Sequence, residues 1–262
     1  MMKIFNGINE WHKVKNPIVT VGSFDGVHLA HRSIISLLNH YAEIEHGESV
    51  LVTFYPHPRL VIPAEEGFRE RFRLITIEEE KMRCLEDAGL QNVLVLPFTV
   101  EFASLPSNDF IKKILVDVIH AKKVITGFNH SFGHDRNGGY EDMLEQGKHY
   151  GFSVDKYPEY IVHNRKISST HIRELIRNGK IMEANELLGY NFMAMGKCEG
   201  GVLEIDNPVK IIPSDGLYLC RVYAEELLHY AVCEIRERKI YFKDLSFITA
   251  NVAATAQFIK EL

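Results

Sequence analysis

Apolar runs bounded by turn residues alternate with segments of helical periodicity through the first part of the chain. The runs are apolar almost throughout, as in parallel strands that are covered on both faces. Between them, apolar side chains recur at helical spacing, and at 31–44 they place Ile34, Ile35, Leu38, Tyr41 and Ala42 on one face. This βα alternation predicts an α/β protein with a doubly wound parallel sheet. Strands are expected at 17–24, 49–55, 92–98, 122–128 and 152–157, with further helices at 76–89 and 107–120.

The pattern changes near residue 190. Before this point, residues 176–190 read as two short helices that are broken at Gly179. After it, strand-like runs are separated by short turn segments, which is typical of antiparallel sheets. We therefore expect a smaller antiparallel β domain over 191–262 after a larger domain over 1–190. Its strands are expected at 202–206, 216–224, 229–237 and 239–245, and 252–262 is expected to form a final helix.

Composition and charge limit the classes of protein that the chain can belong to. Apolar residues make up 46% and charged residues 25% of the 262 residues, as in globular proteins. Four cysteines without a CxxC pair indicate reduced thiols rather than a zinc ribbon or a disulfide framework. The net charge of -5 gives no long-range attraction for nucleic acid, whereas a small anion needs only a local positive site. No stretch approaches the ~18 apolar residues of a membrane-spanning helix, so we expect no membrane association and a cytoplasmic location.

Two histidines, His28 and His31, follow the first predicted strand in "GSFDGVHLAHR". Ligands of open α/β sheets bind beyond the carboxyl ends of the strands, and a helix N-terminus favours an anion. Gly22 and Gly26 permit a tight backbone path close to such a ligand. The histidines are therefore candidates to donate hydrogen bonds to phosphate oxygens. The alternative is that Asp25 or His31 only caps the helix while His28 is a solvated loop residue.

Later segments also place polar side chains at strand ends or helix starts. In "TFYPHPR", prolines on both sides present His57 rigidly, although a plain turn explains the same residues. The segment "GFNHSFGHDRNGG" (127–139) suits a loop around a flat ligand, and its glycines disfavour a helical zinc site at His130 and His134. In "ISSTHIREL", hydroxyl groups and Arg173 meet at a helix start. That combination can clamp phosphate, although Ser and Thr are also common helix caps.

The set and order of these segments resemble the bacterial riboflavin kinase/FAD synthetases, specifically their FMN adenylyltransferase module. The resemblance extends from about residue 16 to residue 190. It is carried by "GSFDGVHLAH", "TFYPHP", "FRLITIEEEK", "FASLPSNDFI", "GFNHSFGHDRNGG" and "ISSTHIREL". It implies an HxGH-type nucleotidyltransferase domain over 1–190 and a reduced riboflavin-kinase-like, β-barrel-like domain over 191–262.

The resemblance implies roles for individual residues. His28, His31 and Arg173 would be the catalytic residues at the ATP phosphates, and Mg²⁺ would be the cofactor. No carboxylate is an obvious ligand for Mg²⁺ in the sequence, and we take Asp25 as the candidate. The implied ATP-binding residues are Gly22, Ser23, Phe24, His28, His31, Ser168, Ser169, Thr170 and Arg173. The implied FMN-binding residues are His57, Pro58, Phe128, Asn129 and Arg136.

The chain departs from the family's pattern in both parts. Ala30 replaces the glycine of HxGH, and Asn129 and Ser131 stand where the family commonly has an acidic residue and an arginine. The β domain lacks the PTAN-type segment that serves Mg²⁺ and ATP in riboflavin kinases. The similar "ITANV" (248–252) has no proline and follows the predicted strands. We therefore expect no riboflavin kinase activity.

The resemblance implies that the chain is an FAD synthetase, which transfers the adenylyl group of ATP to FMN and releases pyrophosphate. A phosphate monoester has a second pKa of about 6, so the FMN phosphate is ionised near neutral pH and requires no general base. Catalysis is then mostly positioning and charge stabilisation, with His28, His31 and Arg173 neutralising charge. Two alternatives remain: nucleotidyl transfer to another phosphate-bearing acceptor, and a non-catalytic flavin-nucleotide-binding or regulatory protein.

Overall fold

The computed structural model of the chain describes residues 1–62, 68–128, 138–162, 165–224, 227–243 and 251–262. By its internal contacts the chain divides into two compact units, and each unit is drawn from separate stretches of the sequence. Unit one comprises Met1–Phe24, Ala30–Phe72 and Leu85–Tyr160. Unit two comprises Asp25–Leu29, Arg73–Cys84 and Ile161–Leu262. The domain boundary expected near residue 190 stays a prediction.

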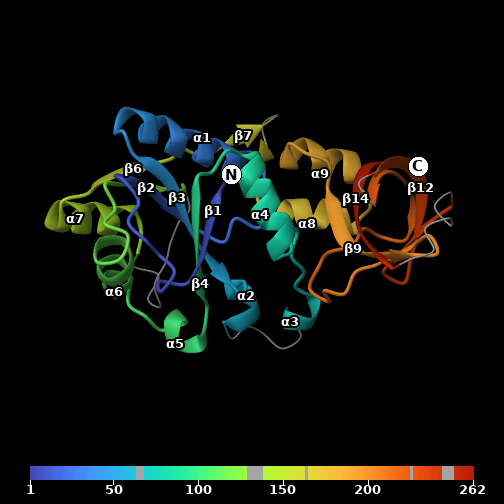
Figure 1. Ribbon diagram of the computed structural model, residues 1–262, viewed down its shortest axis with the longest axis horizontal. Coiled ribbons are helices and arrows are strands. Elements are labelled where there is room, and N and C mark those ends of the chain that lie inside the picture. Colours follow the sequence, from blue (N-terminus) through green and yellow to red (C-terminus); the bar gives the residue numbers. More distant parts are fainter. Residues whose placement is uncertain (63–67, 129–137, 163–164, 225–226, 244–250) are drawn as a thin grey trace. The chain divides into compact units, whose positions relative to one another are not determined.

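A parallel sheet forms the centre of unit one (Figure 1). Its strands are β1 (Lys3–Asn6), β2 (Pro17–Val21), β3 (Glu48–Tyr55), β4 (Asn92–Pro97), β5 (Lys123–Thr126) and β6 (Ser153–Lys156). They lie in the order β1-β4-β3-β2-β5-β6, and every neighbouring pair is parallel. This confirms the predicted α/β class. The strand order reverses at β2, so the carboxyl ends of β2 and β5 flank the position where open α/β sheets bind ligands.

The predicted strands of the sheet lie where the apolar runs are, but β1 was not predicted. Every residue of β2 is buried, as in a strand that is covered on both faces. By contrast, only Phe5 is buried in β1, which lies at the edge of the sheet. Its sequence of four residues, half of them polar, is too short to form the apolar run by which the other strands are found.

Helices connect the strands of unit one. The predicted helix at 31–44 is α1 (Leu29–Ile44), and the predicted helix at 107–120 is divided into α6 (Ser107–Phe110) and the π-helix η1 (Ile111–Val116). Among the described helices, none has the length and apolar character needed to cross a bilayer. The buried residues of α1 are Ile34, Ile35, Leu38 and Ala42. The other helices of unit one are α2 (Pro58–Val61), α3 (Phe68–Arg71), α5 (Val100–Ala103) and α7 (Tyr140–Tyr150). Residues of both units form α4 (Glu78–Asp87), whereas α8 (Ser169–Arg177) and α9 (Ile181–Leu188) belong to unit two.

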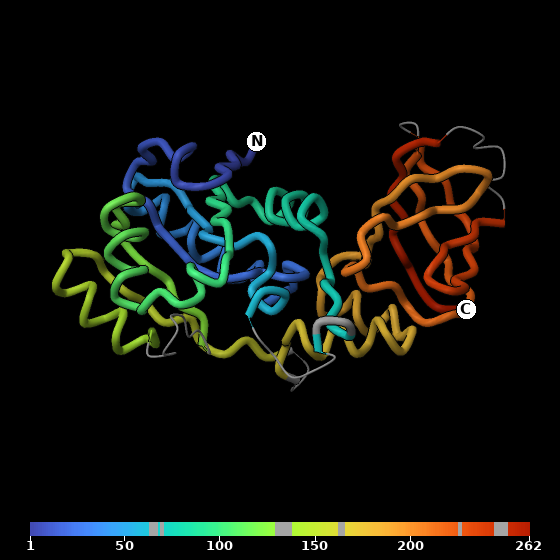
Figure 2. The backbone as a smooth tube through the Cα atoms, turned by 90° about the horizontal axis from the view of Figure 1, so that it is seen from below, coloured from blue at the N-terminus to red at the C-terminus, as the bar shows by residue number. Residues whose placement is uncertain are grey.

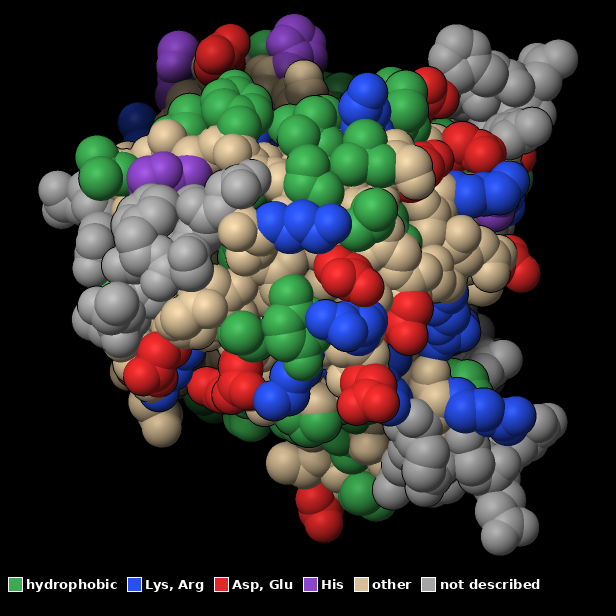
Figure 3. All heavy atoms as spheres, turned by 90° about the vertical axis from the view of Figure 1, so that its right-hand side faces the viewer, with side chains coloured by type: hydrophobic (Ala, Val, Ile, Leu, Met, Phe, Trp, Pro, Cys, Tyr) green, Lys and Arg blue, Asp and Glu red, His purple; other side chains and the backbone are tan. Residues whose placement is uncertain are grey.

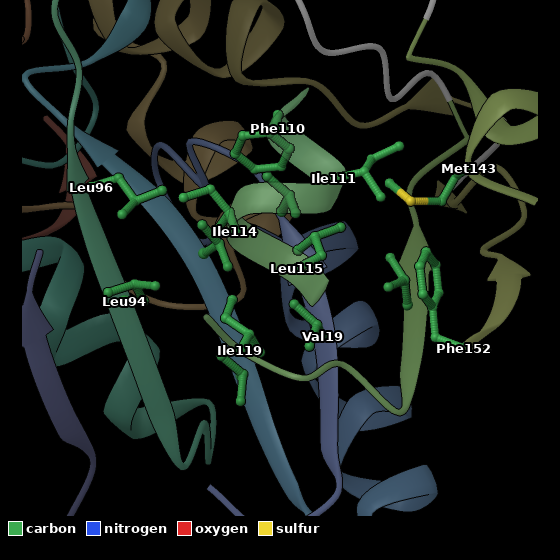
Figure 4. Packing of buried hydrophobic residues seen from close by; sticks show 14 of the residues in the cluster. Val19, Leu94, Leu96, Phe110, Ile111, Ile114, Leu115, Ile119, Met143 and Phe152 are labelled. Atoms are coloured by element: carbon green, nitrogen blue, oxygen red, sulfur yellow. The ribbon is translucent and has the colours of Figure 1, made fainter. Parts of the chain in front are cut away.

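An apolar cluster packs between the sheet and a helical layer in unit one (Figure 4). Val19 of β2 and Leu94 and Leu96 of β4 lie on the sheet, and Ile114 and Leu115 of η1 pack with them. All of these side chains are buried. Burying an aliphatic side chain of this size contributes about 1.5–3 kcal/mol. The cluster thus fixes the sheet and, with it, the starting points of the loops at its carboxyl edge.

Unit two contains a closed antiparallel barrel, which Figure 2 traces as the orange and red tube. The barrel strands are β9 (Met193–Glu199), β10 (Val202–Glu204), β11 (Gly216–Ala224), β12 (Leu227–Arg236), β13 (Lys239–Phe242) and β14 (Val252–Glu261). They lie in the order β10-β13-β12-β11-β14-β9. The closed antiparallel barrel confirms the predicted barrel-like β architecture. A two-stranded sheet of β7 (Ile161–Val162) and β8 (Arg165–Lys166) precedes α8.

The prediction of a final helix at 252–262 is wrong, because this segment forms β14. Its alanines have high intrinsic helix propensity, which favoured the incorrect assignment. In the barrel, however, β14 pairs along both edges, so that Ala256 lies opposite Val222 of β11 and Ala194 of β9. Ala256 and Phe258 are fully buried. Pairing on both sides and closure of the barrel outweigh local propensity.

The inner and outer surfaces of the barrel differ in their side chains. Cys198, Cys220 and Cys233 are buried in this unit, as is Cys84, the fourth cysteine of the chain. The hydrogen bond that Cys220 shares with Cys233, together with burial, raises the pKa of the Cys220 thiol and keeps it protonated. Figure 3 shows a face on which exposed hydrophobic side chains lie between charged ones. The exposed apolar residues of β11 and β12 are Leu217, Tyr223, Leu227, Leu228 and Tyr230.

Candidate active site

The loop after β2 adopts a backbone conformation that L-residues seldom take. Phe24, Gly26 and Val27 have φ angles of 51°, 82° and 35°. A left-handed conformation costs a non-glycine residue free energy, and such residues cluster at functional sites. Both Phe24 and Val27 are buried, so surrounding contacts hold the loop in this form.

Asp25 anchors the loop through its side chain. The main-chain N–H groups of Ile75 and Thr76 each donate to the Asp25 carboxylate over 3.0 Å. The Arg173 guanidinium donates to the other carboxylate oxygen over 2.8 Å. Asp25 and Arg173 are only 4% and 7% exposed, so little water screens their attraction. The structure therefore brings Asp25 and Arg173, two predicted site residues, into one buried ion pair.

Three further side chains hold the main chain of the loop. The Ser169 hydroxyl donates to the Asp25 carbonyl over 3.0 Å, and the Tyr190 hydroxyl donates to the Gly26 carbonyl over 2.6 Å. The Gly26 N–H donates to the Thr76 hydroxyl over 3.0 Å. Because both sides of the Gly26 peptide are bonded, its orientation is fixed before any ligand binds.

Replacing Gly26 with alanine is expected to destabilise the protein more than replacing Gly151, whose φ of +84° is nearly the same. Both substitutions impose the left-handed conformation on alanine, at a cost of about 1–2 kcal/mol. A Cβ at Gly26 would also lie 2.9 Å from the Ile75 Cδ1 atom, whereas a Cβ at Gly151 meets nothing within 4 Å. Overpacking of this kind adds about 1–3 kcal/mol. Urea unfolding of G26A and G151A measures the difference, and equal losses would contradict the packing argument.

His28 precedes α1 and is buried, with 4% of its surface exposed. Burial lowers the pKa of its imidazole from 6.5 to about 4; the Asp25 carboxylate opposes this shift and the Arg173 guanidinium adds to it. His28 is consequently neutral near pH 7. In the protein without ligand it can donate a hydrogen bond to a phosphate oxygen as a neutral group, and its expected role in neutralising phosphate charge stays a prediction.

Stability is expected to fall with acidity through His28. Between pH 6.5 and about 4 the unfolded chain binds a proton at this residue and the folded chain does not, so the free energy of unfolding decreases as the pH falls through this window. H28Q has no imidazole to bind this proton. The free energy of unfolding of the wild type, relative to that of H28Q, should therefore be about 2 kcal/mol smaller at pH 5 than at pH 7. Urea unfolding of both proteins at the two pH values tests this. A constant difference would show that the His28 pKa is not lowered.

His31 lies in the first turn of α1, within unit one. Its ring stacks on Phe24, with centroids 4.4 Å apart and planes 20° from parallel. Gly22 makes room for that ring, because a Cβ there would lie 3.0 Å from Phe24 carbon atoms. Ser23 belongs to the same stretch, and its carbonyl accepts a hydrogen bond from the Thr53 hydroxyl over 3.4 Å. Contact of these residues with ATP stays a prediction.

The start of α8 combines a helix cap with a potential phosphate site. Ser168 is the N-cap, and its hydroxyl accepts a hydrogen bond from the His171 N–H over 3.2 Å. Ser169 holds the Asp25 carbonyl, while Thr170 is exposed. The capping explanation thus applies to Ser168. It does not exclude a phosphate, since the first turn of a helix carries more N–H donors than one cap can satisfy.

The described residues that are expected on the FMN side belong to unit one. His57 is the N-cap of α2, with its ring 5.3 Å from that of Phe72, and Pro58 is the first helical residue. Phe128 is 46% exposed after β5, and the Lys156 ammonium lies 5.3 Å from its ring centroid. Asn129 and Arg136 lie outside the described residues. FMN binding by all of these residues stays a prediction.

The described residues do not form a protein-built metal site. Among them, no group of three or more His, Cys, Asp or Glu side chains could hold a metal ion. The Asp25 carboxylate already accepts hydrogen bonds from main-chain N–H groups and from Arg173. This environment favours a structural role for Asp25, and its assignment as a Mg²⁺ ligand stays a prediction.

Some residues that support the loop were not identified from the sequence. Thr76 and Ile75 lie in "FRLITIEEEK", a segment that carried the resemblance but received no site role. Tyr190 lies 164 positions from the carbonyl that it binds. A lone tyrosine beyond a helix has no local pattern that reveals such a contact. The "FRLITIEEEK" segment, by contrast, could have been assigned to the site from its place among the ordered motifs.

Comparison with known proteins identifies the family. The FAD synthetase family model matches residues 11–171. The FAD synthetase of Listeria monocytogenes is 31% identical over 204 residues, which are 77% of this chain and 79% of that protein. The bifunctional riboflavin kinase/FMN adenylyltransferase of Buchnera aphidicola (Schizaphis graminum) is 33% identical over 198 residues, which are 75% of this chain. The match spans only 62% of that relative's length.

A solved structure has the same fold over the whole chain. The structure titled as a macrolide-efflux protein from Streptococcus pneumoniae superposes with a TM-score of 0.87 and covers 100% of this chain and 91% of that one. At 23% identity, the likeness concerns the fold alone. The sequence matches identify the family independently, since the family model covers more than half of the residues. The chain belongs to the FAD synthetase family.

Proposed function

We propose that this protein transfers the adenylyl group of ATP to FMN, giving FAD and pyrophosphate. The observation that carries the proposal is the buried cluster of Asp25, His28 and Arg173 beside the start of α8, within a chain of the FAD synthetase family. This cluster offers a fixed cation and hydrogen-bond donors, which a triphosphate requires. We also propose that residues 1–190 form the nucleotidyltransferase domain and residues 191–262 a β domain without kinase activity.

In the proposed reaction a phosphate oxygen of FMN attacks the α-phosphorus of ATP. The new P–O bond forms as the bond to the pyrophosphate oxygen breaks, and the electron pair leaves with pyrophosphate. The attacking phosphate is ionised near neutral pH, so no side chain has to accept a proton. The residues of this chain then act by positioning and by stabilising charge on the phosphates.

The proposed division of work follows from the charges in the site. Arg173 supplies the positive charge, because its guanidinium stays protonated at all relevant pH values. His28 is neutral in the protein without ligand and donates a hydrogen bond. The N–H groups at the start of α8 add further donors. We expect Mg²⁺ to reach the site bound to the phosphates of ATP, as is usual for this ion.

Chromatography of reaction mixtures tests the proposal. The full-length protein is incubated with ATP and Mg²⁺ plus either FMN or riboflavin, and riboflavin, FMN and FAD are separated. The expected result is FAD from FMN with riboflavin unchanged, and loss of FAD formation when EDTA removes the metal. FMN from riboflavin would overturn the proposed absence of kinase activity. No conversion of either flavin would favour another acceptor or a flavin-nucleotide-binding protein.

A further inference from the structure

A fully buried ion pair lies within unit two. The Lys210 ammonium donates to a Glu80 carboxylate oxygen over 2.6 Å, and both side chains are 0% exposed. The ammonium also donates to the Ile75 carbonyl and lies 4.4 Å from the ring centroid of Phe192. The other Glu80 oxygen accepts from the Met195 N–H, at the barrel strand β9, over 2.9 Å. Desolvation offsets most of the attraction in such a pair, so net stability is a poor explanation for it.

Main-chain hydrogen bonds join the segment before α4 to the segment before β11. The Leu74 N–H donates to the Val209 carbonyl over 2.7 Å, and the Ile211 N–H donates to the Leu74 carbonyl over 2.9 Å. Glu80 adds a third connection, since its carboxylate accepts from the Ile77 N–H over 3.0 Å and from the Met195 N–H of β9. Residues 74–77 are therefore bonded to residues 209–211 directly and to β9 through Glu80.

The same short segment holds the loop after β2. The Ile75 and Thr76 N–H groups donate to Asp25, which in turn accepts from Arg173. Ile75 thus bonds Lys210 through its carbonyl and Asp25 through its N–H. Both bonds fix the same residue, so a change at Lys210 that moves this residue also moves the carboxylate that orients Arg173.

We propose that Lys210 and Glu80 are positioning residues, through which the barrel sets the geometry of Asp25 and Arg173 at the ATP phosphates. The inference rests on the proposed function, because it assigns a purpose to the β domain in that reaction. It gives the barrel a role that needs no kinase activity. The pair acts through the peptides of 75–77 and does not touch substrate itself.

The variant E80Q/K210M tests the proposal in the full-length protein. Removing both charges leaves no unpaired buried ion, so the chain is expected to fold. The loosened loop should raise the KM for ATP and lower kcat, for a combined loss of about tenfold to a hundredfold in kcat/KM for ATP. The KM for FMN should change by less than about twofold, because the pair positions only residues that are assigned to ATP. Partial unfolding would instead lower the concentration of active enzyme and leave both KM values unchanged.

The matched control is E204Q/K239M, which removes the exposed barrel pair Lys239–Glu204, 2.7 Å long with side chains 52% and 56% exposed. Its ATP kinetics should equal those of the wild type. A folded E80Q/K210M with wild-type kcat/KM for ATP would overturn the proposal, as would an equal loss in the control.

Calorimetric binding of ATP separates this inference from the proposed function. If the wild type binds ATP but makes no FAD, the proposed function fails, and a weaker ATP Kd in E80Q/K210M still supports positioning. If E80Q/K210M does not fold, the variant R238M tests the proposal instead. Arg238 is exposed and donates to the Lys210 carbonyl over 3.0 Å, so its replacement loosens Lys210 without burying an unpaired charge. A raised ATP Kd in R238M supports the proposal, and an unchanged Kd overturns it.

Discussion

The variant R173M is expected to lose at least about a hundredfold in kcat/KM for FAD formation, since it removes the cation assigned to the transition-state phosphates. It should also lose about 3–5 kcal/mol of stability, because the Asp25 carboxylate stays buried without its guanidinium partner. Steady-state kinetics, at a temperature where the variant is folded, and urea unfolding measure the two losses separately.

Two controls distinguish lost chemistry from lost stability. In D25N/R173M the buried charge is removed together with its partner, so stability should recover in part while FAD formation stays low. K180M breaks the exposed Lys180–Glu183 pair, 3.1 Å long, beyond α8, and should behave as wild type. Wild-type kcat/KM in folded R173M, or full recovery of activity in D25N/R173M, would show that Arg173 acts only in the fold.

Replacing either His28 or His31 with alanine is expected to lower kcat for FAD formation by about 10²–10³, the usual effect of removing one preorganised donor. FMN binding should change little, because neither histidine is assigned to the flavin. Stopped assays give kcat, and quenching of flavin fluorescence gives the FMN Kd. A flavin-nucleotide-binding protein would instead show no turnover in the wild type.

H40A provides the matched control for these variants. His40 is an exposed residue of the same helix α1, so its removal changes neither the loop nor the start of the helix. Its kcat should match the wild type. If H28A and H31A also keep wild-type kcat, the paired histidines are structural and the phosphate contacts must come from other residues.

Most of the fold could be predicted because its elements are locally consistent. β2 and β3 carry buried, almost wholly apolar runs, and α1 buries one face at helical spacing. β14 could not be predicted in this way, since its alanine-rich sequence favours a helix until the barrel supplies partners on both edges. β1 could not be predicted either, because a short edge strand with one buried residue carries almost no hydrophobic pattern.

The candidate site could be predicted in its motifs but not in its electrostatics. The sequence identifies Asp25, His28 and Arg173 as candidates, yet it cannot show that Asp25 binds the guanidinium. It also cannot show that burial keeps His28 neutral, because the burial comes from residues remote in sequence. Glu80 and Lys210, which are 130 positions apart, meet only in the folded chain.

The hydrogen bonds that hold the loop after β2 also constrain the order of folding. A nascent chain that has emerged only as far as β6, which ends at Lys156, already contains every strand of the parallel sheet. It still lacks Arg173, Tyr190 and Lys210, whose contacts close over sequence separations of 148, 164 and 135 residues. Contacts of such separation form late, after the loop-closure entropy has been overcome. The sheet can therefore assemble during synthesis, whereas the loop after β2 reaches its final geometry only once the barrel sequence has left the ribosome.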